Sequence, residues 1–300
     1  MKTVITHPNF DYLWDKIALD NKINRANVSF EKFEDGWPNI FINWVKELVE
    51  HKEITYIWDF SKSEDLFLNF AAIRWILDYY ANKVRVILPY FPVGTMERID
   101  TKWQVATARY YADIMSQFPF ARETKTSIHI FDIHALVERF LFDSHSVNVE
   151  IHTAMSLLRD EIKWKSIVFP DEWALKRFWK DFKDQDIIVC SKVRNWNKRE
   201  ITIKEWDPKW KDVIIIDDLI QTGWTIKKTA EKLRELGAKS VSSYATHWVF
   251  PNNSHIDLAK SLDKLIVTDT IPANIKRAEE VINMEVFSIK WLVEKIMFHD

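Results

Sequence analysis

Glycine is the residue that this sequence most clearly lacks. The 300-residue chain has four glycines and 15 tryptophans, whereas average usage would give about 7% glycine, or roughly 20 residues. Glycine is the usual choice where the backbone needs a positive φ or passes close to a ligand. Either the turns of this protein are unusual, or other residues stand where glycine is expected.

Cysteine occurs once, as Cys190, which excludes a disulfide framework and a cysteine-based metal site. Its apolar surroundings, DIIVCSK (186–192), predict a core residue and not a nucleophile. No apolar run reaches the ~18 residues of a membrane span, and the first residues are too polar for a signal peptide. We therefore expect a cytoplasmic protein with no membrane partner.

An excess of positive charge is also absent. Lys and Arg number 42 against 44 Asp and Glu, a net charge of −2, so there is no electrostatic case for a nucleic-acid partner. Apolar residues make up 47% of the chain and charged residues 29%, as in soluble globular proteins. The length suffices for two domains.

Short apolar runs alternate with amphipathic segments along the chain, which predicts an α/β protein with mainly parallel sheets covered by helices. The predicted strands are 54–60, 84–91, 127–133, 166–170, 186–192, 212–217, 240–247 and 264–269. The predicted helices are 63–81, 104–117, 153–162, 172–182 and 225–236, the last ended by Gly237.

The domain boundary is expected where the periodicity is weakest, at 143–152. This predicts an N-terminal domain over 1–147 and a C-terminal domain over 148–286, as tandem copies of one α/β plan. The apolar helix at 287–300 is expected to join the N-terminal domain.

The segment DVIIIDDLIQTGWT (212–225) combines a buried strand, two acids, a turn and a helix start. Free backbone N–H groups and the positive helix end make such a turn an anion site. The acids would then hold sugar hydroxyls or a magnesium shell beside the anion. The alternative is a plain strand–turn–helix with acidic capping.

The segment VIIIDDLIQTGWT resembles the phosphoribosyl-diphosphate-binding motif of type I phosphoribosyltransferases and of ribose-phosphate diphosphokinases (PRPP synthetases). Further segments follow the order found in PRPP synthetases, and the resemblance covers about 30 to 270. The amino-acid sequences of the segments FPVGTMER, FDIHALVERF and SKVR are most similar to the plant-type, class II branch. Those further segments are 87–100, 131–142, 169–178, 190–205 and 244–251.

The resemblance implies two tandem type I phosphoribosyltransferase-like domains, each a mainly parallel sheet flanked by helices. It implies transfer of the diphosphoryl group of ATP to the C1 hydroxyl of ribose 5-phosphate, giving PRPP and AMP for nucleotide biosynthesis. Mg²⁺ would be the cofactor and a homo-oligomer the assembly.

The resemblance also assigns the site residues. Ribose 5-phosphate would bind at Asp171, Asp217, Asp218, Gln221, Thr222, Gly223, Trp224 and Thr225. ATP would bind at Phe33, Asp35, Thr95, Met96 and Arg98. The metal site would comprise Asp132, His134 and Asp143, and the catalytic residues would be Lys192, Arg194 and His134.

Strand periodicity agrees with two of these assignments. Lys192 and Arg194 lie two apart on a predicted strand that returns after a polar tip, so both cations face one side, as a clamp on one anion requires. Asp132 and His134 have the same spacing, and a hard cation prefers the carboxylate. His134 could instead be a hydrogen-bonded strand-end histidine. We expect His129 to be structural.

One loop departs from the commoner class I pattern, which has an Arg-Gln pair where this chain has Thr95 and Met96. The departure leaves the choice of ATP over other nucleoside triphosphates open. It agrees with the class II resemblance, which implies looser nucleotide choice and no strict need for inorganic phosphate.

Seven tryptophans stand where the resembled family has glycine. Replacing glycine at a positive φ costs ~1–3 kcal/mol, so seven such changes would exhaust a typical stability of about 5–15 kcal/mol. We hypothesise that these letters come from a UGA codon that the organism reads as glycine. Trp14, Trp44 and Trp291, in helical contexts, are expected to be genuine. The seven positions are Trp103, Trp173, Trp196, Trp206, Trp210, Trp224 and Trp248.

Rival explanations stay open at this point. The chain could be engineered, or it could be a non-catalytic relative that binds catalytic subunits, since Trp224 would fill the ribose-phosphate turn. The presence of all the expected acids and cations favours an enzyme. A nucleobase phosphoribosyltransferase is disfavoured, because that class has one such domain and no triphosphate site.

Overall fold

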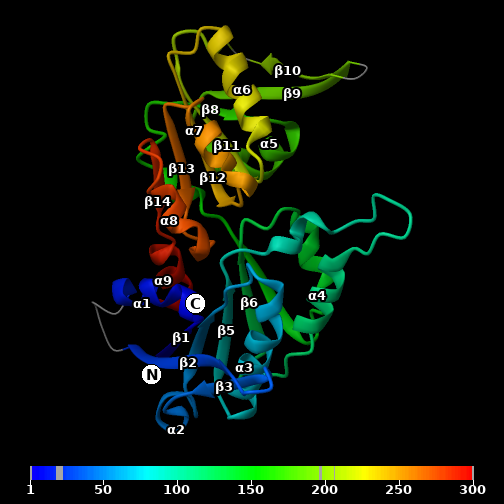
Figure 1. The fold of residues 1–300 in the computed structure, drawn as a ribbon, viewed down its shortest axis with the longest axis vertical. Helices are drawn as coiled ribbons and strands as arrows, with labels where there is room; N and C mark the ends of the chain where they lie inside the picture. Colours follow the sequence, from blue (N-terminus) through cyan, green and yellow to red (C-terminus); the bar gives the residue numbers. More distant parts are fainter. Residues whose placement is uncertain (1, 18–22, 196–197, 206, 299–300) are drawn as a thin grey trace. The chain divides into compact units, whose positions relative to one another are not determined.

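The computed structural model describes residues 2–17, 23–195, 198–205 and 207–298, and the side chains of 15, 16, 64, 191–195 and 198–205 are outside this description. The chain divides into two compact units. Unit 1 comprises Met1–His152 and Lys290–Asp300, and unit 2 comprises Thr153–Ile289. Figure 1 shows that each unit is built around its own sheet.

Unit 1 contains a seven-stranded sheet in the order β3-β2-β1-β4-β5-β6-β7. Only β2 and β3 pair antiparallel; the other neighbours are parallel. The strands are β1 (Lys2–Thr6), β2 (Ile23–Lys32), β3 (Pro38–Ile42), β4 (Glu53–Ile57), β5 (Lys83–Leu88), β6 (Thr126–Phe131) and β7 (Val147–His152). The helices are α1 (Asp11–Ile17), α2 (Val45–Leu48), α3 (Leu66–Asp78), α4 (Thr107–Met115) and α9 (Lys290–Phe298).

Unit 2 contains a second seven-stranded sheet in the order β10-β9-β8-β11-β12-β13-β14. Again only one pair, β9 and β10, is antiparallel. The strands are β8 (Ser166–Phe169), β9 (Ile187–Asn195), β10 (Lys198–Glu205), β11 (Asp212–Ile220), β12 (Ser240–Trp248), β13 (Lys264–Thr268) and β14 (Met284–Phe287). The helices are α5 (Glu172–Phe178), α6 (Trp224–Glu235), α7 (Ser254–Ala259) and α8 (Ile275–Ala278).

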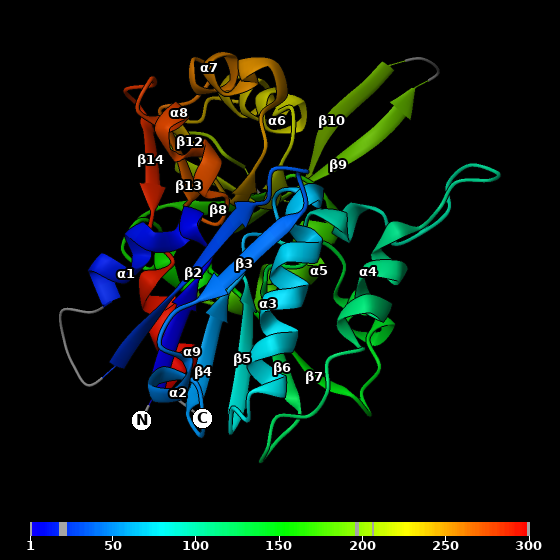
Figure 2. The same ribbon diagram turned by 60° about the horizontal axis from the view of Figure 1, so that its bottom comes forward.

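The two sheets have the same strand order. If the strands of each unit are numbered from its own first strand, both sheets have the order 3-2-1-4-5-6-7. Figure 2 shows the antiparallel pair of each sheet, β2 with β3 and β9 with β10. The predicted tandem α/β plan is therefore confirmed at the level of topology.

Helices cover the sheets through faces that the sequence spacing predicts. Helix α3 buries Ala72, Ile73 and Ile76 in one cluster with strand residues of β4 and β5. Helix α6 buries Ile226, Ala230 and Leu233 against β11 and β12. Apolar residues three and four positions apart form one helix face, which packs on the sheet. Gly237, at φ 87°, ends α6 as predicted.

Helix α9 belongs to the compact unit that contains the first sheet. The Lys2 ammonium of β1 donates a 2.5 Å hydrogen bond to the Met297 carbonyl. Leu292, Val293, Ile296 and Met297 are buried. The unit boundary falls after His152, and the predicted boundary segment 143–152 contains strand β7.

Two groups of secondary-structure predictions were wrong or incomplete. The helix expected over 153–162 is only a 3-10 turn at Met155–Leu158. The Met155 N–H donates to Thr153 Oγ1, a local side-chain hydrogen bond that competes with a regular helix. Strands β1, β2, β3, β7 and β14 were not predicted. Several of them are edge or hairpin strands with polar or half-exposed residues, so they lack a continuous apolar run.

The tryptophans fall into distinct structural groups. Trp103 and Trp210 have φ values of 71° and 63° and are 88% and 78% exposed. Trp44 was expected to be a helical residue, but it precedes α2 at φ 58°. Trp248 is fully buried, and its indole N–H donates to the Thr268 carbonyl at 2.8 Å. The backbone thus favours glycine at the first three positions, whereas the core accommodates the tryptophan at the last.

Replacing Trp210 by Gly should raise the free energy of unfolding by about 1 kcal/mol, because it relieves left-handed strain. Replacing Trp248 by Gly should lower it by about 3–5 kcal/mol, because it empties a core position. Urea unfolding measures both. Trp164→Gly is the control, since Trp164 is 85% exposed and lies outside the left-handed region; a stability loss in Trp210→Gly matching that of the control would contradict the strain argument.

Candidate active site

The turn after β11 is the centre of the predicted ribose-phosphate site. Gly223 has φ 79° and ends the turn, and α6 begins at Trp224. The backbone N–H groups of Val249 and Phe250 donate to the carbonyls of Ile220 and Gln221, which ties the turn to the residues after β12. The first N–H groups of α6 have no partner within the helix, so this end can receive an anion.

Gly223 is required at this position for two reasons. Its φ of 79° disfavours any residue with a side chain. A Cβ atom there would lie 2.9 Å from Leu258 Cδ2, and Leu258 is buried in the core. Thr222 Oγ1 accepts a 3.4 Å hydrogen bond from the Trp224 N–H. Gln221, Thr222 and Trp224 are exposed, and Thr225 is half-buried.

Three predicted acids come together at the carboxyl ends of β8 and β11. Burial raises the pKa of the Asp217 carboxyl well above its ordinary value, and the neighbouring Asp218 and Asp171 raise it further. The Asp218 N–H donates to Asp217 Oδ1 at 2.9 Å. Asp218 is 6% exposed. Carboxyl groups held this close cannot all ionise cheaply, so the site favours ligands that supply hydroxyl donors or positive charge.

Arg177 was not among the predicted site residues. Its guanidinium lies 3.6 Å from Asp218 Oδ2, and both side chains are largely buried. Arg177 lies in α5, which begins next to Asp171. The only sequence signal for Arg177 as a site residue was its position in the segment FPDEWALKRF. Its pairing with Asp218 could not be predicted, because it depends on how α5 packs beside β11.

The capping alternative for 212–225 is wrong for Asp217 and Asp218, although the neighbouring Asp171 does cap a helix. Asp171 is the N-cap of α5, and its carboxylate accepts hydrogen bonds from the N–H groups of Trp173 and Ala174 at 3.1 and 3.0 Å. Helix α6, by contrast, starts from Gly223 with no side-chain cap. Asp217 and Asp218 therefore do not serve as caps of the helix that follows them.

Cys190 is a core residue, as predicted. Its side chain is fully buried. Burial, with a smaller contribution from Asp171, raises the pKa of the thiol to about 12. The thiolate that nucleophilic chemistry needs is therefore disfavoured.

In unit 1, the segment after β6 contains the predicted metal ligands. Asp132 is 1% exposed and adopts φ 36°, a left-handed value that is strained for a residue other than glycine. Its N–H donates to the His152 carbonyl at 2.9 Å. His134 is exposed two residues later.

The predicted ATP loop lies against this segment. A Cβ atom on Gly94 would lie 3.4 Å from His134 Cβ and 3.1 Å from Glu138 Oε2. Gly94 therefore allows the turn containing Thr95 and Met96 to approach the residues after Asp132. Arg98 is 71% exposed and pairs with Asp100 at 3.0 Å.

Phe33 and Asp35 lie in the turn that joins β2 to β3. Phe33 is 55% exposed, and its N–H donates to the Trp37 carbonyl. Asp35 Oδ1 accepts from the Trp37 N–H at 3.1 Å. An exposed aromatic ring on a turn that is held by hydrogen bonds can stack on a planar base.

Two predicted groups were not joined to the site by described contacts. Asp143 accepts from the His145 N–H and the Ser146 hydroxyl, which lower the pKa of its carboxyl. The described contacts of the carboxylate thus lie within its own loop, while the Asp143 N–H donates to Ser116 Oγ. Lys192 and Arg194 lie in β9, which pairs with β10 as a hairpin, but their side chains are outside the described residues. The predicted hairpin is confirmed, and the roles of these residues stay predictions.

Comparisons with known proteins place the chain in a family. It is 34% identical to ribose-phosphate pyrophosphokinase 4 of Oryza sativa subsp. japonica, over 91% of this chain and 87% of the relative. It is also 34% identical to ribose-phosphate pyrophosphokinase 3, mitochondrial, of Spinacia oleracea, over 94% and 73%. The chain belongs to the ribose-phosphate pyrophosphokinase family.

Further matches agree with this family. Residues 190–296 match the phosphoribosyl synthetase-associated domain. The crystal structure of phosphoribosylpyrophosphate synthetase from Mycobacterium smegmatis superposes with a TM-score of 0.81 at 21% identity, covering 100% of this chain and 99% of that one, which supports the fold. A ribose-phosphate pyrophosphokinase of the bacterium Buchnera aphidicola is 30% identical. The higher identity to the plant proteins confirms the predicted plant-type branch.

In the described part of this chain, no helix is both long and apolar enough to cross a membrane.

Gly223→Ala should destabilise unit 2 more than Gly237→Ala does. Both glycines have a positive φ, but a Cβ on Gly237 meets only the flexible Lys209 side chain, at 3.4 Å, whereas that on Gly223 meets Leu258. We expect a loss of about 1 kcal/mol for Gly237→Ala and about 1–3 kcal/mol more for Gly223→Ala, measured by urea unfolding. Equal losses would mean that Leu258 moves aside freely.

Asp217→Asn should stabilise the free protein at about pH 7.5. Because the pKa of Asp217 is raised in the folded chain, its contribution to stability is complete below its ordinary pKa of about 4 and is lost as the pH rises through the raised value. The gain over wild type should therefore vanish near pH 4. Urea unfolding across this range measures it, with the exposed Asp184→Asn as control; a gain independent of pH would contradict the prediction.

Proposed function

We propose that this protein is a ribose-phosphate diphosphokinase, which transfers the diphosphoryl group of ATP to the C1 hydroxyl of ribose 5-phosphate and releases AMP. The observation that carries the proposal is the arrangement at the carboxyl end of β11. There, the Asp217–Asp218 pair in the strand is followed by the Gly223 turn and the start of α6. An acid pair beside an anion-binding helix start suits a sugar phosphate, which offers hydroxyl groups and a phosphate together.

The ribose hydroxyls bind to Asp217, Asp218 and Asp171 in this proposal. The raised pKa of Asp217 means that its ionised carboxyl is disfavoured in the free protein, and hydroxyl donors from the sugar would stabilise it. The 5-phosphate binds to the turn after Asp218, through backbone N–H groups and two threonine hydroxyls. That turn comprises Gln221, Thr222, Gly223, Trp224 and Thr225.

The triphosphate and Mg²⁺ bind at the end of β6. Mg²⁺ usually takes one or two protein carboxylates and completes its shell with water and phosphate oxygens, and the buried Asp132 oxygen with its strained backbone fits that demand. His134 lies beside it, and Asp143 is the further acid. When bound, Mg²⁺ neutralises phosphate charge.

The adenine base stacks on Phe33 and contacts Asp35, while Thr95, Met96 and Arg98 line the nucleotide loop. The approach of Gly94 to His134 supports this assignment, because it brings the nucleotide loop beside the residues proposed for the metal. With Thr95 and Met96 in place of an Arg-Gln pair, other nucleoside triphosphates are accepted as well.

In the reaction the C1 hydroxyl oxygen attacks the β-phosphorus of ATP and its proton is released to water, while the bond from that phosphorus to the bridging α-phosphate oxygen breaks and AMP leaves. Such transfers need positioning and positive charge more than covalent help. Lys192 and Arg194 on the β9–β10 hairpin, with His134, supply charge to the transferring group. The proposal includes a cytoplasmic homo-oligomer, although relatives carry mitochondrial and chloroplastic names.

The assay combines ATP, ribose 5-phosphate and Mg²⁺ and follows AMP and PRPP. Protein with glycine in place of Trp103, Trp173, Trp196, Trp206, Trp210 and Trp224 should form both products in equal amounts; Trp248 is kept, because its side chain fills a core position. Lys192→Ala made in that background sets the baseline for contaminating activity. Absence of AMP from both the glycine-bearing and the tryptophan-bearing protein would defeat the proposal.

Trp224→Gly alone should raise kcat/KM for ribose 5-phosphate at least about tenfold, or about 1.4 kcal/mol of transition-state stabilisation. Trp224 is the first residue of α6 and 40% exposed, so its side chain stands at the helix end that would receive the phosphate. Trp164→Gly removes another exposed tryptophan of the same unit and should change nothing. Equal effects of the two changes would remove Trp224 from the site.

A further inference from the structure

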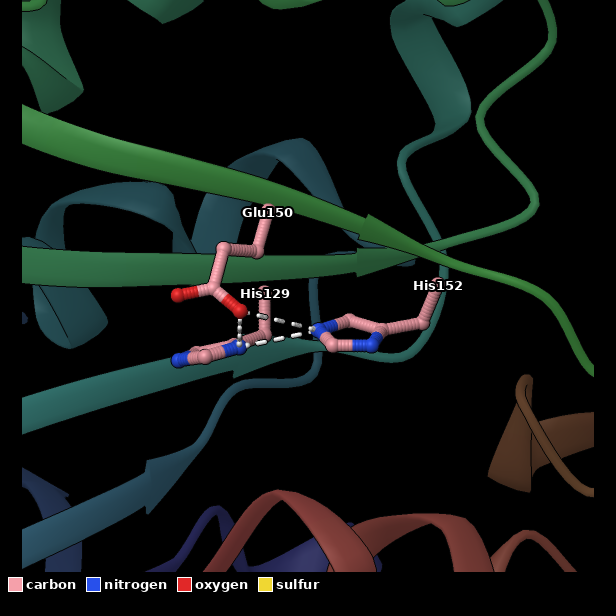
Figure 3. Close-up of side chains that lie close together, drawn as sticks. All are labelled: His129, Glu150 and His152. Atoms are coloured by element: carbon pink, nitrogen blue, oxygen red, sulfur yellow. Dashed lines mark hydrogen bonds and ion pairs between the residues drawn. The ribbon is translucent and has the colours of Figure 1, made fainter. Parts of the chain in front are cut away.

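A cluster of three side chains in unit 1 is not used by the proposed reaction. His129, Glu150 and His152 lie on neighbouring strands β6 and β7, and Figure 3 shows their side chains converging. In the parallel register His129 is opposite Glu150. His152 is two residues further along β7, so all three side chains lie on one face of the sheet.

The three ligand atoms form a compact triangle. His129 Nδ1 lies 2.9 Å from His152 Nε2. Glu150 Oε2 lies 3.7 Å from His129 Nδ1 and 4.0 Å from His152 Nε2. Ligand atoms at about 2.0–2.1 Å from a tetrahedral zinc ion are about 3.3–3.4 Å apart. The observed separations bracket this value, so shifts of well under about 1 Å would form the site.

We propose that His129 Nδ1, Glu150 Oε2 and His152 Nε2 bind one divalent transition-metal ion of the zinc class, separately from the Mg²⁺ of the reaction. Two imidazoles and a carboxylate are ligands that zinc accepts and that Mg²⁺ disfavours.

The surroundings of the cluster suit such an ion. Ser127 Oγ lies 2.9 Å from His129 Nε2, and a hydrogen bond to the second ring nitrogen is what orients metal-binding histidines. His129 is 3% exposed, whereas the side chain of Glu150 is 56% exposed. The cluster therefore has one side held by the protein and one open to water, which can fill a fourth position.

Groups of both charge signs lie near the cluster. Burial lowers the pKa of His152, Lys295 of α9 lowers it further, and Asp132 acts in the opposite direction with a smaller effect. The acidic group of the cluster itself is Glu150. The ion would join β6 to β7, the last strand of unit 1. It would also support Asp132, whose N–H donates to the His152 carbonyl.

The test is isothermal titration of chelator-treated protein with Zn²⁺ in excess Mg²⁺, which keeps the Asp132–His134 site supplied. Wild type should bind one zinc ion per chain, and Co²⁺ in its place should give the visible absorption of a tetrahedral site. His152→Asn and Glu150→Gln should each weaken zinc binding by more than about tenfold. Ser127→Ala should weaken it about 10- to 100-fold, as removal of an orienting partner does.

The matched control is His51→Asn. His51 is half-exposed in the same unit, and its ring lies 3.7 Å from Glu50 and 2.6 Å from Arg122 Nη1, so it forms a surface histidine–glutamate pair away from the cluster. Its φ of 57° is one that asparagine tolerates, and the variant should bind zinc as wild type does. The competing explanation is a plain N–H···N hydrogen bond between the two imidazoles.

Absence of stoichiometric zinc binding by wild type, or unchanged binding in both His152→Asn and Glu150→Gln, would overturn the proposal. Loss of binding in His51→Asn would also overturn it, because the ion would then lie elsewhere. Cooperative urea unfolding of each variant establishes that it is folded, and Glu150→Gln changes an exposed side chain by one atom, so at least one variant remains informative.

Discussion

The proximity of acidic groups at the end of β11 is the constraint on which unit 2 depends. Burial and neighbouring carboxyls make the ionised form of Asp217 unfavourable, and this cost must be offset by the rest of the fold. Strand β11 lies between β8 and β12 and contributes four consecutive fully buried residues, 213–216, before the acids. The Arg177 guanidinium adds a positive charge 3.6 Å from Asp218 Oδ2. A rigid apolar strand can thus hold an arrangement that becomes favourable when a sugar supplies hydroxyl groups.

The shared strand order explains where the functional segments lie. In each unit the third strand, counted within that unit, lies at the edge of the sheet and pairs antiparallel with the second strand; these pairs are β3 with β2 and β10 with β9. In unit 1 that hairpin carries Phe33 and Asp35, and in unit 2 it carries Lys192 and Arg194. The proposed nucleotide and catalytic segments are therefore topological equivalents. The end of β6, with Asp132, corresponds in the same way to the end of β13. Both units thus have an antiparallel hairpin and a set of parallel strand ends at equivalent positions, but the residues at these positions differ and are proposed to bind different groups.

Backbone conformation separates the tryptophans that sequence comparison could only group. Trp44, Trp103 and Trp210 have a left-handed φ, which glycine adopts without strain. Trp44 was expected to be genuine from its helical context, yet it belongs with this group. Trp248 satisfies its indole N–H inside the core, so there the larger residue has a structural place. Trp196 and Trp206 lie outside the described residues.

The sequence by itself determined the α/β class, the strand–turn–helix of 212–225 and the β9–β10 hairpin, because each depends on local periodicity and turn residues. It did not predict the edge strands β3, β7 and β14, the turn at 153–162 or the pairing of Arg177 with Asp218, because these depend on packing between distant segments. His129 was expected to be structural, and only the register of β6 against β7 brings it to Glu150 and His152. Local patterns are set by neighbours along the chain, whereas contacts between side chains from separate strands and helices exist only once the sheets have formed.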